Sequence, residues 1–384
     1  MKKVLRMKTV VHISADYPDA FAPNKTAAVA NLIQGSPGFR HVVYSLNRVD
    51  GLFGINGVEF AKDQVSLIYR APPKGLLLRT RLNDVAEWIL VDLRSRGIEP
   101  NLVHAHKFTI EGLVALRLRE SLGCPVICNI QGNTDTYIAT RRIDVRPAYR
   151  ELAVTCDRIL SFAPWSGPAM QRILGTPLSY EVLPVGTTCD RLLAPTVSDE
   201  VRLVSLFHLD SWRDKGADTL AAAAAVVAAD RPGLMPDIYG GGSGKQQKAL
   251  TSAIRDCAPA GLVRLRGPLP RDRVQQTLNG YSAFVMPSLH ETYGLAFVEA
   301  IFSGTPVVFP RGRAIDGILP ESDIGAGCEP SSIDDLAHAI NHVLDNEARL
   351  KRRIADAQTA GELDHLRRES IGARYRKILE DTAA

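Results

Sequence analysis

The sequence lacks any long hydrophobic run. Its longest apolar block, LAAAAAVVAA at residues 220–229, has about half of the ~20 residues that a membrane-spanning helix needs, so no span is expected. The apolar run near the start follows Lys2 and Lys3, reaches Asp16 too early for a secretory signal, and has no small-residue cleavage site. We therefore expect this run to be the first strand of a cytoplasmic protein.

Cysteine is scarce and shows no metal-binding spacing. The six cysteines form no C-x-x-C pair, and a chain of 384 residues gains little from a disulfide framework. Cys124 and Cys128 flank PVI and are expected on one strand, as packed thiols rather than as metal ligands. The composition therefore favours a reducing compartment and predicts neither a disulfide scaffold nor a zinc-binding cysteine set.

The net charge is small, at +4, but it is unevenly placed. Residues 1–190 carry 23 Lys and Arg against 17 Asp and Glu, a balance of +6, whereas the rest of the chain has a balance of −2. The basic half suggests an anionic partner. The stretch YRAPPKGLLLRTR, residues 69–81, surrounds leucines with basic residues, which suits contact with an anionic membrane surface; a loop that leads into a solvated helix fits it equally well. No basic helix or aromatic-interleaved basic strand indicates nucleic-acid binding.

The remaining pattern predicts an α/β fold. Short β-branched runs such as KTVVHIS, NLVHAH and PVICNI alternate with helical patterns such as NDVAEWILVDLRSRG, which ends at glycine. The alternation pauses at residues 191–200, where RLLAPTVSDE has the composition of a linker, and then restarts. We therefore predict two doubly wound Rossmann-like domains, residues 1–190 and 201–366, that face a central cleft. A C-terminal helix at about residues 367–384 is expected to pack back on the first domain.

The segment YGGGSGKQQ, residues 239–247, has some features of a phosphate-binding loop. A P-loop requires G-x-x-x-x-G-K-[ST], but alignment on Gly244 and Lys245 puts Tyr239 at the first glycine and Gln246 at the hydroxyl position. A P-loop ATPase is therefore not expected. Two interpretations stay open: the glycines let backbone N–H groups approach an anion at a helix N-terminus, or they form a tight turn alone.

Two glutamates lie eight residues apart in AFVMPSLHETYGLAFVEAIFSGTPVVFP, residues 283–310. Glu291 is expected in the loop after a strand, and Glu299 in the second turn of a helix that starts near Gly294. A carboxylate accepts two hydroxyl groups, as binding of a ribose diol requires, and the N–H groups near residues 293–295 favour a diphosphate. The simpler interpretation is that the two glutamates are a solvated loop charge and a helix-surface charge.

This stretch resembles the E-x7-E signature of the retaining GT-B glycosyltransferases of family 4, the glycosyl transferases group 1. The resemblance extends through LFHLDSWRDKGADTLAAAAAVV, DIYGGGSG, VRLRGPLPRDRV, YEVLPVGTT and NLVHAHKF, over nearly the whole chain. It implies the GT-B fold and transfer of a hexosyl group from a nucleoside-diphosphate sugar to a glycan or lipid-linked acceptor, in bacterial surface polysaccharide or envelope synthesis. The diphosphate would be the leaving group, and neither a metal nor another cofactor would be required.

The resemblance also implies roles for individual residues. Glu299 would hold the nucleotide ribose, and Glu291 would contact hydroxyls of the donor sugar. Lys215 would neutralise the diphosphate as the glycosidic bond breaks, and His106 would touch the sugar or orient the acceptor. Further candidates on the donor side are Gly241, Gly242, Tyr293, Gly294, Leu295, Arg266, Pro268 and His208.

The strand before Lys215 departs from the family pattern. The family usually has an arginine there, where this chain has Phe207 and His208, and we hypothesise that Arg213 supplies the missing charge. Lys215 itself could be a plain residue at a helix N-terminus. A cation is unfavourable in that position, which argues for a functional role.

The acceptor or phosphate side departs from the pattern as well. The first β–α loop reads FAPNKTAAV in place of paired glycines, so Asn24, Lys25 and Thr26 would lie at a helix N-terminus, with Asn24 as an ordinary N-cap in the simplest case. Gln131 stands where a histidine is common and is a further candidate on this side. These changes affect the expected phosphate contacts and the acceptor rather than the fold.

The polar residues admit other interpretations. His104 and His106 share one strand face, where packing against a neighbouring helix explains them most simply, and zinc is not expected because no third ligand lies nearby. Two carboxylates also suit a glycosidase, but the nucleotide-like setting weighs against it. Three rivals stay open: a nucleotide-sugar epimerase on the same fold, a non-catalytic nucleotide-sugar binder, and a membrane-surface scaffold resting on residues 69–81.

Overall fold

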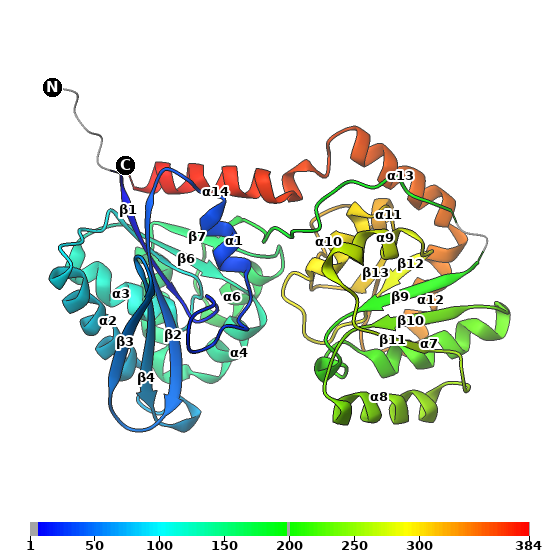
Figure 1. Ribbon diagram of the computed structural model, residues 1–384, viewed down its shortest axis with the longest axis horizontal. Helices are drawn as coiled ribbons and strands as arrows, with labels where there is room; N and C mark the ends of the chain where they lie inside the picture. Colours follow the sequence, from blue (N-terminus) through cyan, green and yellow to red (C-terminus); the bar gives the residue numbers. More distant parts are fainter. Residues whose placement is uncertain (1–6, 198–199, 384) are drawn as a thin grey trace. The chain divides into compact units, whose positions relative to one another are not determined.

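The computed structural model describes residues 7–197 and 200–383, with the side chains of 321 and 322 excepted, and divides into two compact units (Figure 1). The first unit contains the described residues up to Phe162, then Ser166–Gly186 and the helix that starts at Arg368; the second contains Ala163–Trp165 and Thr187–Arg367. The boundary falls after Gly186 rather than at residue 190. The described residues of the expected linker, 191–197 and 200, belong to the second unit, where the Leu193 amide donates to the Phe302 carbonyl at 2.8 Å; residues 198 and 199 lie outside the described residues.

The first unit contains an eight-stranded sheet in the order β3-β4-β2-β1-β5-β6-β7-β8. All neighbouring pairs are parallel except β3 with β4, which are joined through Asp63 at φ 61°. Residues 40–71 thus form three consecutive strands and depart from the predicted strand–helix alternation. The strands are β1 (Thr9–Ser14), β2 (Arg40–Asp50), β3 (Ile55–Ala61), β4 (Gln64–Ala71), β5 (Leu102–Ala105), β6 (Val126–Ile130), β7 (Arg158–Ser161) and β8 (Glu181–Val182).

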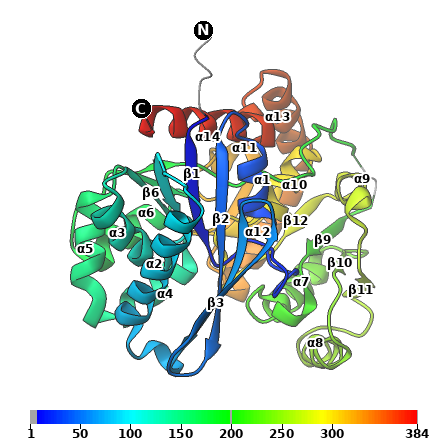
Figure 2. The same ribbon diagram turned by 60° about the vertical axis from the view of Figure 1, so that its left-hand side comes forward.

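Alternating residues of the central strands serve two different cores. Val11 of β1 and Val103 of β5 face one core, which includes buried residues of α2, α3 and α5, whereas Val10 and Leu102 face another, to which α1 and α14 contribute (Figure 2). Helix α14 therefore packs on the first unit although it ends the described chain. The helices are α1 (Ala28–Gln34), α2 (Leu78–Ser95), α3 (Glu111–Leu122), α4 (Asn133–Arg141), α5 (Arg146–Thr155), α6 (Ser166–Leu174) and α14 (Arg368–Thr382).

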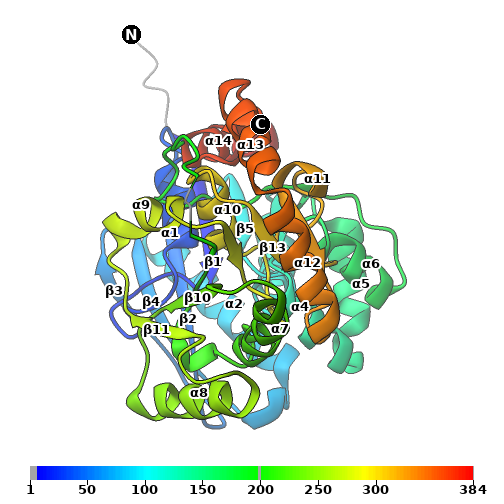
Figure 3. The ribbon, with the colours of Figure 1, turned by 90° about the vertical axis from the view of Figure 1, so that its right-hand side faces the viewer.

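The second unit contains a six-stranded parallel sheet in the order β11-β10-β9-β12-β13-β14. Helix α12 packs on β12, β13 and β14 and beside α7, which in turn packs beside α8 (Figure 3). The strands are β9 (Arg202–Leu206), β10 (Met235–Tyr239), β11 (Arg264–Gly267), β12 (Ala283–Val285), β13 (Val307–Pro310) and β14 (Gly325–Cys328). The helices are α7 (Ala217–Asp230), α8 (Gly244–Cys257), α9 (Val274–Asn279), α10 (Leu295–Phe302), α11 (Glu321–Ile324), α12 (Ile333–Asp345) and α13 (Glu347–Thr359).

The strand order of the second sheet reverses at β9. The chain runs from β9 outward to β10 and β11 and then crosses back to β12 on the other side of β9. In open parallel sheets, ligands bind at the carboxyl ends of the strands where the order reverses. The loops that flank this switch point are residues 207–216, after β9, and residues 286–294, after β12.

None of the helices in the described part of the chain is long and apolar enough to cross a membrane.

Candidate functional site

Gly216 joins the two loops at the switch point. It has φ 65°, and a Cβ at this position would lie 2.4 Å from the Pro287 carbonyl oxygen, so that only glycine fits. Beside it, the Leu289 amide donates a hydrogen bond to the Asp214 carbonyl at 2.8 Å. The loop after β9 is thereby held directly against the loop after β12.

This docking brings Lys215 and Glu291 together. The Lys215 Nζ donates to Glu291 Oε2 at 2.6 Å, and the exposed fractions of the two side chains are only 20% and 14%. The Thr292 amide donates to Glu291 Oε1 at 3.1 Å. Gly294, with φ 75°, then starts α10, and a Cβ there would meet the Phe297 ring at 2.6 Å. A cation, a carboxylate and a helix N-terminus thus share one place, which is suited to a phosphate ester of a hydroxyl-rich group.

Glu299 lies in the second turn of α10, as expected, but its carboxylate is not free. Arg271 donates to Glu299 Oε1 at 2.6 Å and to Oε2 at 3.1 Å, and the Thr187 hydroxyl donates to Oε1 at 2.5 Å. The side chain is 2% exposed. A ribose diol would have to displace Arg271 from this carboxylate, so ribose binding by Glu299 stays a prediction.

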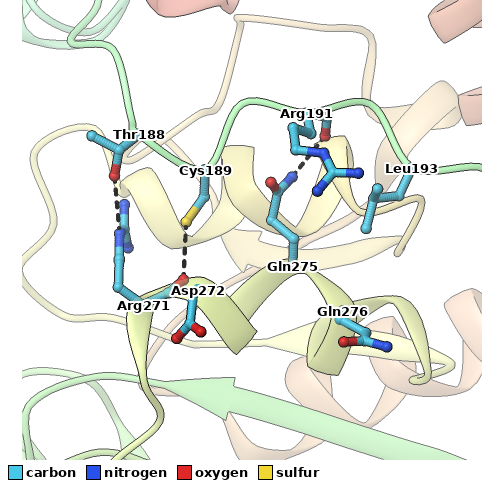
Figure 4. Close-up of a pocket in the computed structure, with 8 residues that line it drawn as sticks. All are labelled: Thr188, Cys189, Arg191, Leu193, Arg271, Asp272, Gln275 and Gln276. Atoms are coloured by element: carbon cyan, nitrogen blue, oxygen red, sulfur yellow. Dashed lines mark hydrogen bonds between the residues drawn. The ribbon is translucent and has the colours of Figure 1, made fainter.

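Arg271 is the residue of this site that the sequence did not single out. It lies in VRLRGPLPRDRV, the segment that resembles the nucleobase-facing part of the family, but no spacing rule connects it with Glu299. Together with Thr188 and Cys189 it lines a hollow of about 750 Å³, in which Gln275 donates to the Arg191 carbonyl at 2.6 Å (Figure 4). The remaining lining residues are Leu193, Asp272 and Gln276.

The glycine loop after β10 packs closely on the segment after β9. A Cβ at Gly240 would lie 1.8 Å from the Phe207 carbonyl oxygen, and one at Gly242 would lie 2.7 Å from Leu209 Cβ. Gly241 is less confined, since its nearest neighbour would be Pro268 at 3.7 Å. These contacts favour the interpretation of the loop as a tight turn. Gln246, the residue that replaces the P-loop hydroxyl, accepts a hydrogen bond from Trp212 Nε1 at 3.2 Å.

The other predicted donor-side residues differ in burial and in their partners. The His208 Nδ1 accepts from the Asp210 amide at 3.4 Å, and Tyr293 is buried. The exposed Arg213 places its guanidinium 4.1 Å from the Trp212 ring, and its proposed phosphate contact stays a hypothesis. The remaining donor-side candidates are the exposed Arg266 and Pro268 and the half-buried Leu295.

A different arginine reaches the Glu291 loop. Arg313, from the loop after β13, donates a hydrogen bond to the Leu289 carbonyl. No sequence pattern singles out Arg313, because this contact depends on two β–α loops that meet only in the folded sheet.

The predicted helix start at Asn24 is wrong. Helix α1 begins at Ala28, its N-cap is Ala27, and no side chain caps it; the Thr26 hydroxyl accepts from the Ala28 amide at 3.3 Å. Lys25 is held instead by Asp19, at 3.1 Å, and by the Ser45 hydroxyl, at 2.9 Å. Residues 24–26 therefore precede α1 in a turn. Lys25 joins this turn to β2 through Ser45 instead of lying at the helix N-terminus.

Gln131, the remaining candidate on the acceptor or phosphate side, donates its backbone amide to Asp135 Oδ2 at 2.8 Å. Asp135 also accepts from the Thr109 amide and hydroxyl, at 2.9 and 2.7 Å. Nearby, Lys107 pairs with Asp16 at 2.6 Å, and burial raises the pKa of Glu111 to about 8. This buried polar cluster at the carboxyl ends of β1, β5 and β6 was not predicted.

His106 belongs to a directional chain of imidazoles under α1 and α14. The His41 Nε2 must donate to the Ser36 carbonyl, at 2.9 Å, since a carbonyl only accepts. With neutral rings, His12 Nε2 then donates to His41 Nδ1 at 2.9 Å, and His106 Nε2 donates to His12 Nδ1 at 3.1 Å. His106 Nδ1 is left as a buried acceptor with no partner among the described residues.

The cluster corrects the prediction that His104 and His106 have no third ligand nearby. His12 lies opposite His104 in the register of β1 and β5, and ligand atoms of the three histidines lie within 4.8 Å of one another. The rings of His104 and His106 are stacked, however, with centroids 4.0 Å apart and 30° between their planes. Lone pairs in nearly parallel planes do not converge on one ion, and His104 is already bonded to Tyr375, at 2.6 Å, and to Asn129, at 2.8 Å.

Full burial of His106 places it inside the first unit. It is 0% exposed, and burial, with further contributions from His104 and Lys107, holds its pKa well below the usual value of 6.5. A neutral, enclosed imidazole does not offer a surface to a sugar, so its predicted contact with donor or acceptor gains no support from this position.

Comparisons with known proteins agree with the geometry of the second unit. Residues 198–360 match the sequence profile described as Glycosyl transferases group 1. A glycogen synthase of Mycobacterium tuberculosis is 30% identical over 145 residues, 38% of this chain and 34% of that protein. The chain spans about a third to a half of the length of the curated relatives that it matches.

Solved structures resemble the chain over almost its full length. Sucrose-phosphate synthase from Thermosynechococcus elongatus has a TM-score of 0.72 at 17% identity, covering 97% of this chain and 98% of that one. A structure described as trehalose-6-phosphate from E. coli, bound with UDP-2-fluoro glucose, has a TM-score of 0.71 at 12% identity, covering 98% and 99%. The chain thus has the two Rossmann-like units of the GT-B fold, and its residues 198–360 are similar to the glycosyl transferases group 1.

Proposed function

We propose that this chain is a retaining family 4 glycosyltransferase that moves a hexosyl group from a nucleoside-diphosphate sugar to a glycan or lipid-linked acceptor. The observation that carries the proposal is the Lys215–Glu291 pair, 2.6 Å apart, at the switch point of the second sheet and directly before α10. The pair lies inside the segment that matches the group 1 profile. We place the reaction in the cytoplasm, at the inner membrane face, in bacterial surface polysaccharide or envelope glycan synthesis.

In the proposed reaction, Lys215 and the first-turn N–H groups of α10 stabilise the charge that develops on the leaving diphosphate. Lys215 is neutralised by Glu291 before the donor binds. When the donor binds, the Lys215 ammonium group pairs with the diphosphate in place of Glu291. Glu291 then accepts hydrogen bonds from hydroxyls of the donor sugar. The bond from C1 to the diphosphate oxygen breaks, the bond from C1 to the acceptor oxygen forms on the same face, and the departing phosphate oxygen takes the acceptor proton. No protein nucleophile and no metal are required for this sequence.

The nucleoside has a proposed place beside Glu299. Its ribose diol would replace the Arg271 guanidinium on the Glu299 carboxylate, and its base would enter the hollow of about 750 Å³ that Thr188, Asp272 and Gln275 line. Polar groups on the wall of this hollow can read the edge of a base by hydrogen bonds.

One observation favours a second candidate function, a nucleotide-sugar binder without turnover. Both oxygens of Glu299 are occupied by Arg271 and Thr187, and this chain has Phe207 and His208 where the family usually has an arginine. A site that lacks the family arginine, and whose Glu299 is already occupied, would bind the nucleotide sugar without transferring the sugar.

The first experiment is thermal unfolding of the protein with UDP, GDP, ADP or CDP, followed by measurement of nucleoside-diphosphate release from the matching sugar donors. A ligand at 100 times its dissociation constant adds about 2.7 kcal/mol, so one nucleotide should raise the Tm by several degrees. Lys215→Ala should lower turnover by about 10²–10³-fold, whereas Lys248→Ala, an exposed lysine of α8, should leave it unchanged.

The outcomes separate the candidates. Stabilisation by a nucleotide with no release under any acceptor supports the binder. Consumption of donor without an acceptor, giving an isomeric sugar nucleotide, supports the epimerase. Absence of stabilisation by every nucleotide, together with absence of release, contradicts the proposed function.

A further inference from the structure

Two loops of the first unit expose apolar side chains at the same end of the sheet. The loop after β2, residues 51–54, exposes Leu52 by 64% and Phe53 by 67%. The segment between β4 and α2, residues 72–77, exposes Leu76 by 65% and Leu77 by 49%. We call these four side chains the apolar tip.

Contacts between the loops make the apolar tip one surface rather than two. Arg81 of α2 donates to the Leu52 carbonyl at 3.4 Å, and its guanidinium lies 4.8 Å from the Phe53 ring. Arg70 at the end of β4 donates to the Asp50 carbonyl at 3.3 Å. The parallel register of β2 and β4 pairs Asp50 with Ala71, so both loops leave the sheet from the same edge, at the lower end of the first unit in Figure 2.

The backbone of the second loop is held in an unusual conformation. Lys74 and Leu77 both have φ 57°, in the left-handed region that disfavours residues other than glycine. Leu77 is half exposed, so burial of its own side chain does not compensate fully for this strain. Strained, exposed residues of this kind concentrate at functional sites.

Exposed cations without carboxylate partners lie next to the apolar tip in the sequence. Nearby acids are already engaged, since Arg48 pairs with Asp50 at 3.1 Å and Arg81 with Asp84 at 2.7 Å. Lys74, Arg79 and Arg70 are exposed and pair with no carboxylate in the described part of the chain. The adjoining end of α4 adds further groups, because Arg142 donates to the Gly75 carbonyl and Ile143 is 66% exposed.

We infer that the apolar tip and its cations dock on an anionic lipid bilayer. Leu52, Phe53, Leu76 and Leu77 would enter the boundary between headgroups and acyl chains, and Lys74, Arg79 and Arg70 would contact lipid phosphates. Apolar side chains within a ring of unpaired cations match this boundary, where apolar and anionic layers meet. The inference rests on the first unit alone and does not depend on the proposed function, although it would hold the chain where a lipid-linked acceptor lies.

The test is sedimentation with vesicles of phosphatidylcholine alone and of phosphatidylcholine with 30% phosphatidylglycerol. We expect binding to the anionic vesicles only, weakened by raising the salt from 0.1 to 0.5 M. Each cation near such a surface contributes about fivefold to partitioning, which is about 1 kcal/mol, so Lys74→Glu with Arg79→Glu should lower it at least ~25-fold. Lys248→Glu, on α8, is the matched charge control and should change it less than twofold.

The apolar contribution has its own variants. Phe53→Ser with Leu76→Ser should lower partitioning at least ~10-fold, whereas Val154→Ser, a 75% exposed valine of α5, should leave it unchanged. Leu77→Gly should weaken binding while it preserves or raises the Tm, because glycine relieves the strained backbone.

Thermal unfolding of every variant checks that the fold is retained. The inference is overturned if the chain does not bind to anionic vesicles, or if both double variants bind to them as strongly as wild type. It is also overturned if the double variants abolish self-association of the chain without affecting vesicle binding, since the surface would then serve a second copy.

Discussion

At the scale of single residues, Arg271 covers the Glu299 carboxylate. Its guanidinium occupies both carboxylate oxygens, at 2.6 and 3.1 Å, where a ribose diol is proposed to bind. Arg271→Ala should therefore raise the affinity for the stabilising nucleoside diphosphate by about tenfold, or ~1.4 kcal/mol, measured by titration calorimetry. It should also lower the free energy of unfolding by about 1–3 kcal/mol, because Glu299 would lose a charged partner while buried.

Arg273→Ala is the control for this prediction. Arg273 is exposed and lies two residues away on the same 3-10 turn, Arg271–Arg273. It should change neither quantity. If Arg271→Ala instead weakens nucleotide binding, Arg271 is a ligand of the nucleotide and not its competitor.

The sequence led to some of these residues and not to others, for one physical reason. The resemblance to family 4 assigned Lys215 to the diphosphate and Glu291 to the sugar of the same donor, and the structure brings the two side chains into contact. Arg271 lies 28 residues before Glu299, and their pairing depends on how the 3-10 turn Arg271–Arg273 lies beside α10, which no periodicity in the sequence records. His12 was missed in the same way, since only the β1–β5 register places it next to His104.

At the scale of elements, Gly216 fixes how the β9 and β12 loops meet. Gly216→Ala would set a Cβ 2.4 Å from the Pro287 carbonyl oxygen and would strain a left-handed backbone. The backbone strain alone costs about 1–3 kcal/mol, and the collision adds to this loss in the free energy of unfolding, which urea titration measures. Turnover should also be lost, because Lys215 is displaced from Glu291.

Gly123→Ala separates strain from collision. Gly123 ends α3 with φ 66°, nearly the value at Gly216, and a Cβ there would meet nothing within 4 Å. Gly123→Ala should therefore lower the free energy of unfolding only by the cost of the left-handed backbone, with no contribution from a collision. Equal losses in the two variants would show that the Pro287 contact does not hold the loop.

Element boundaries were predicted well where caps were local. The pattern TIEGLVALRLRESLG, residues 109–123, predicts a helix that ends at its glycine, and the left-handed C-cap Gly123 of α3 confirms this end. Helix α2, in contrast, starts at Leu78, five residues before the expected start at Asn83, because Leu78 and Leu82 are buried in the first-unit core. The long strand β2 was not singled out, since its central residues, buried on both faces, lack the polar alternation of a half-exposed strand.

At the scale of the whole molecule, the buried histidines make stability depend on pH. Burial lowers the pKa of His104 from 6.5 to about 4, and it also lowers the pKa values of His12, His41 and His106. Between pH 6.5 and 4 the unfolded chain binds protons that the folded chain excludes, so the free energy of unfolding must fall as pH falls. His104 alone accounts for about 3 kcal/mol over this window.

Urea titrations from pH 7 to pH 4 measure this effect. His104→Gln should flatten the decrease by about that amount, because glutamine does not titrate, whereas His365→Gln, at an exposed position, should reproduce the wild-type slope. A His104→Gln profile parallel to wild type would contradict the assignment of a neutral, buried His104.

The predicted fold class is confirmed for the molecule as a whole: two Rossmann-like units with parallel sheets. Such a fold is readable from sequence because each β–α repeat carries its own pattern of buried and exposed residues. The meeting of distant segments, as in the histidine cluster or the apolar tip, follows from sheet order and register, which the repeats do not encode locally.

Helix α14 determines when the first unit can complete its packing during synthesis. Tyr375 reaches His104 across 271 residues of chain, so the partner of a buried imidazole is made only after the second unit has been translated. At roughly 5–20 residues per second, the face of β1 and β5 that α14 covers stays open for about 15–50 s on each emerging chain. During synthesis, we therefore expect a chaperone to bind to this apolar face.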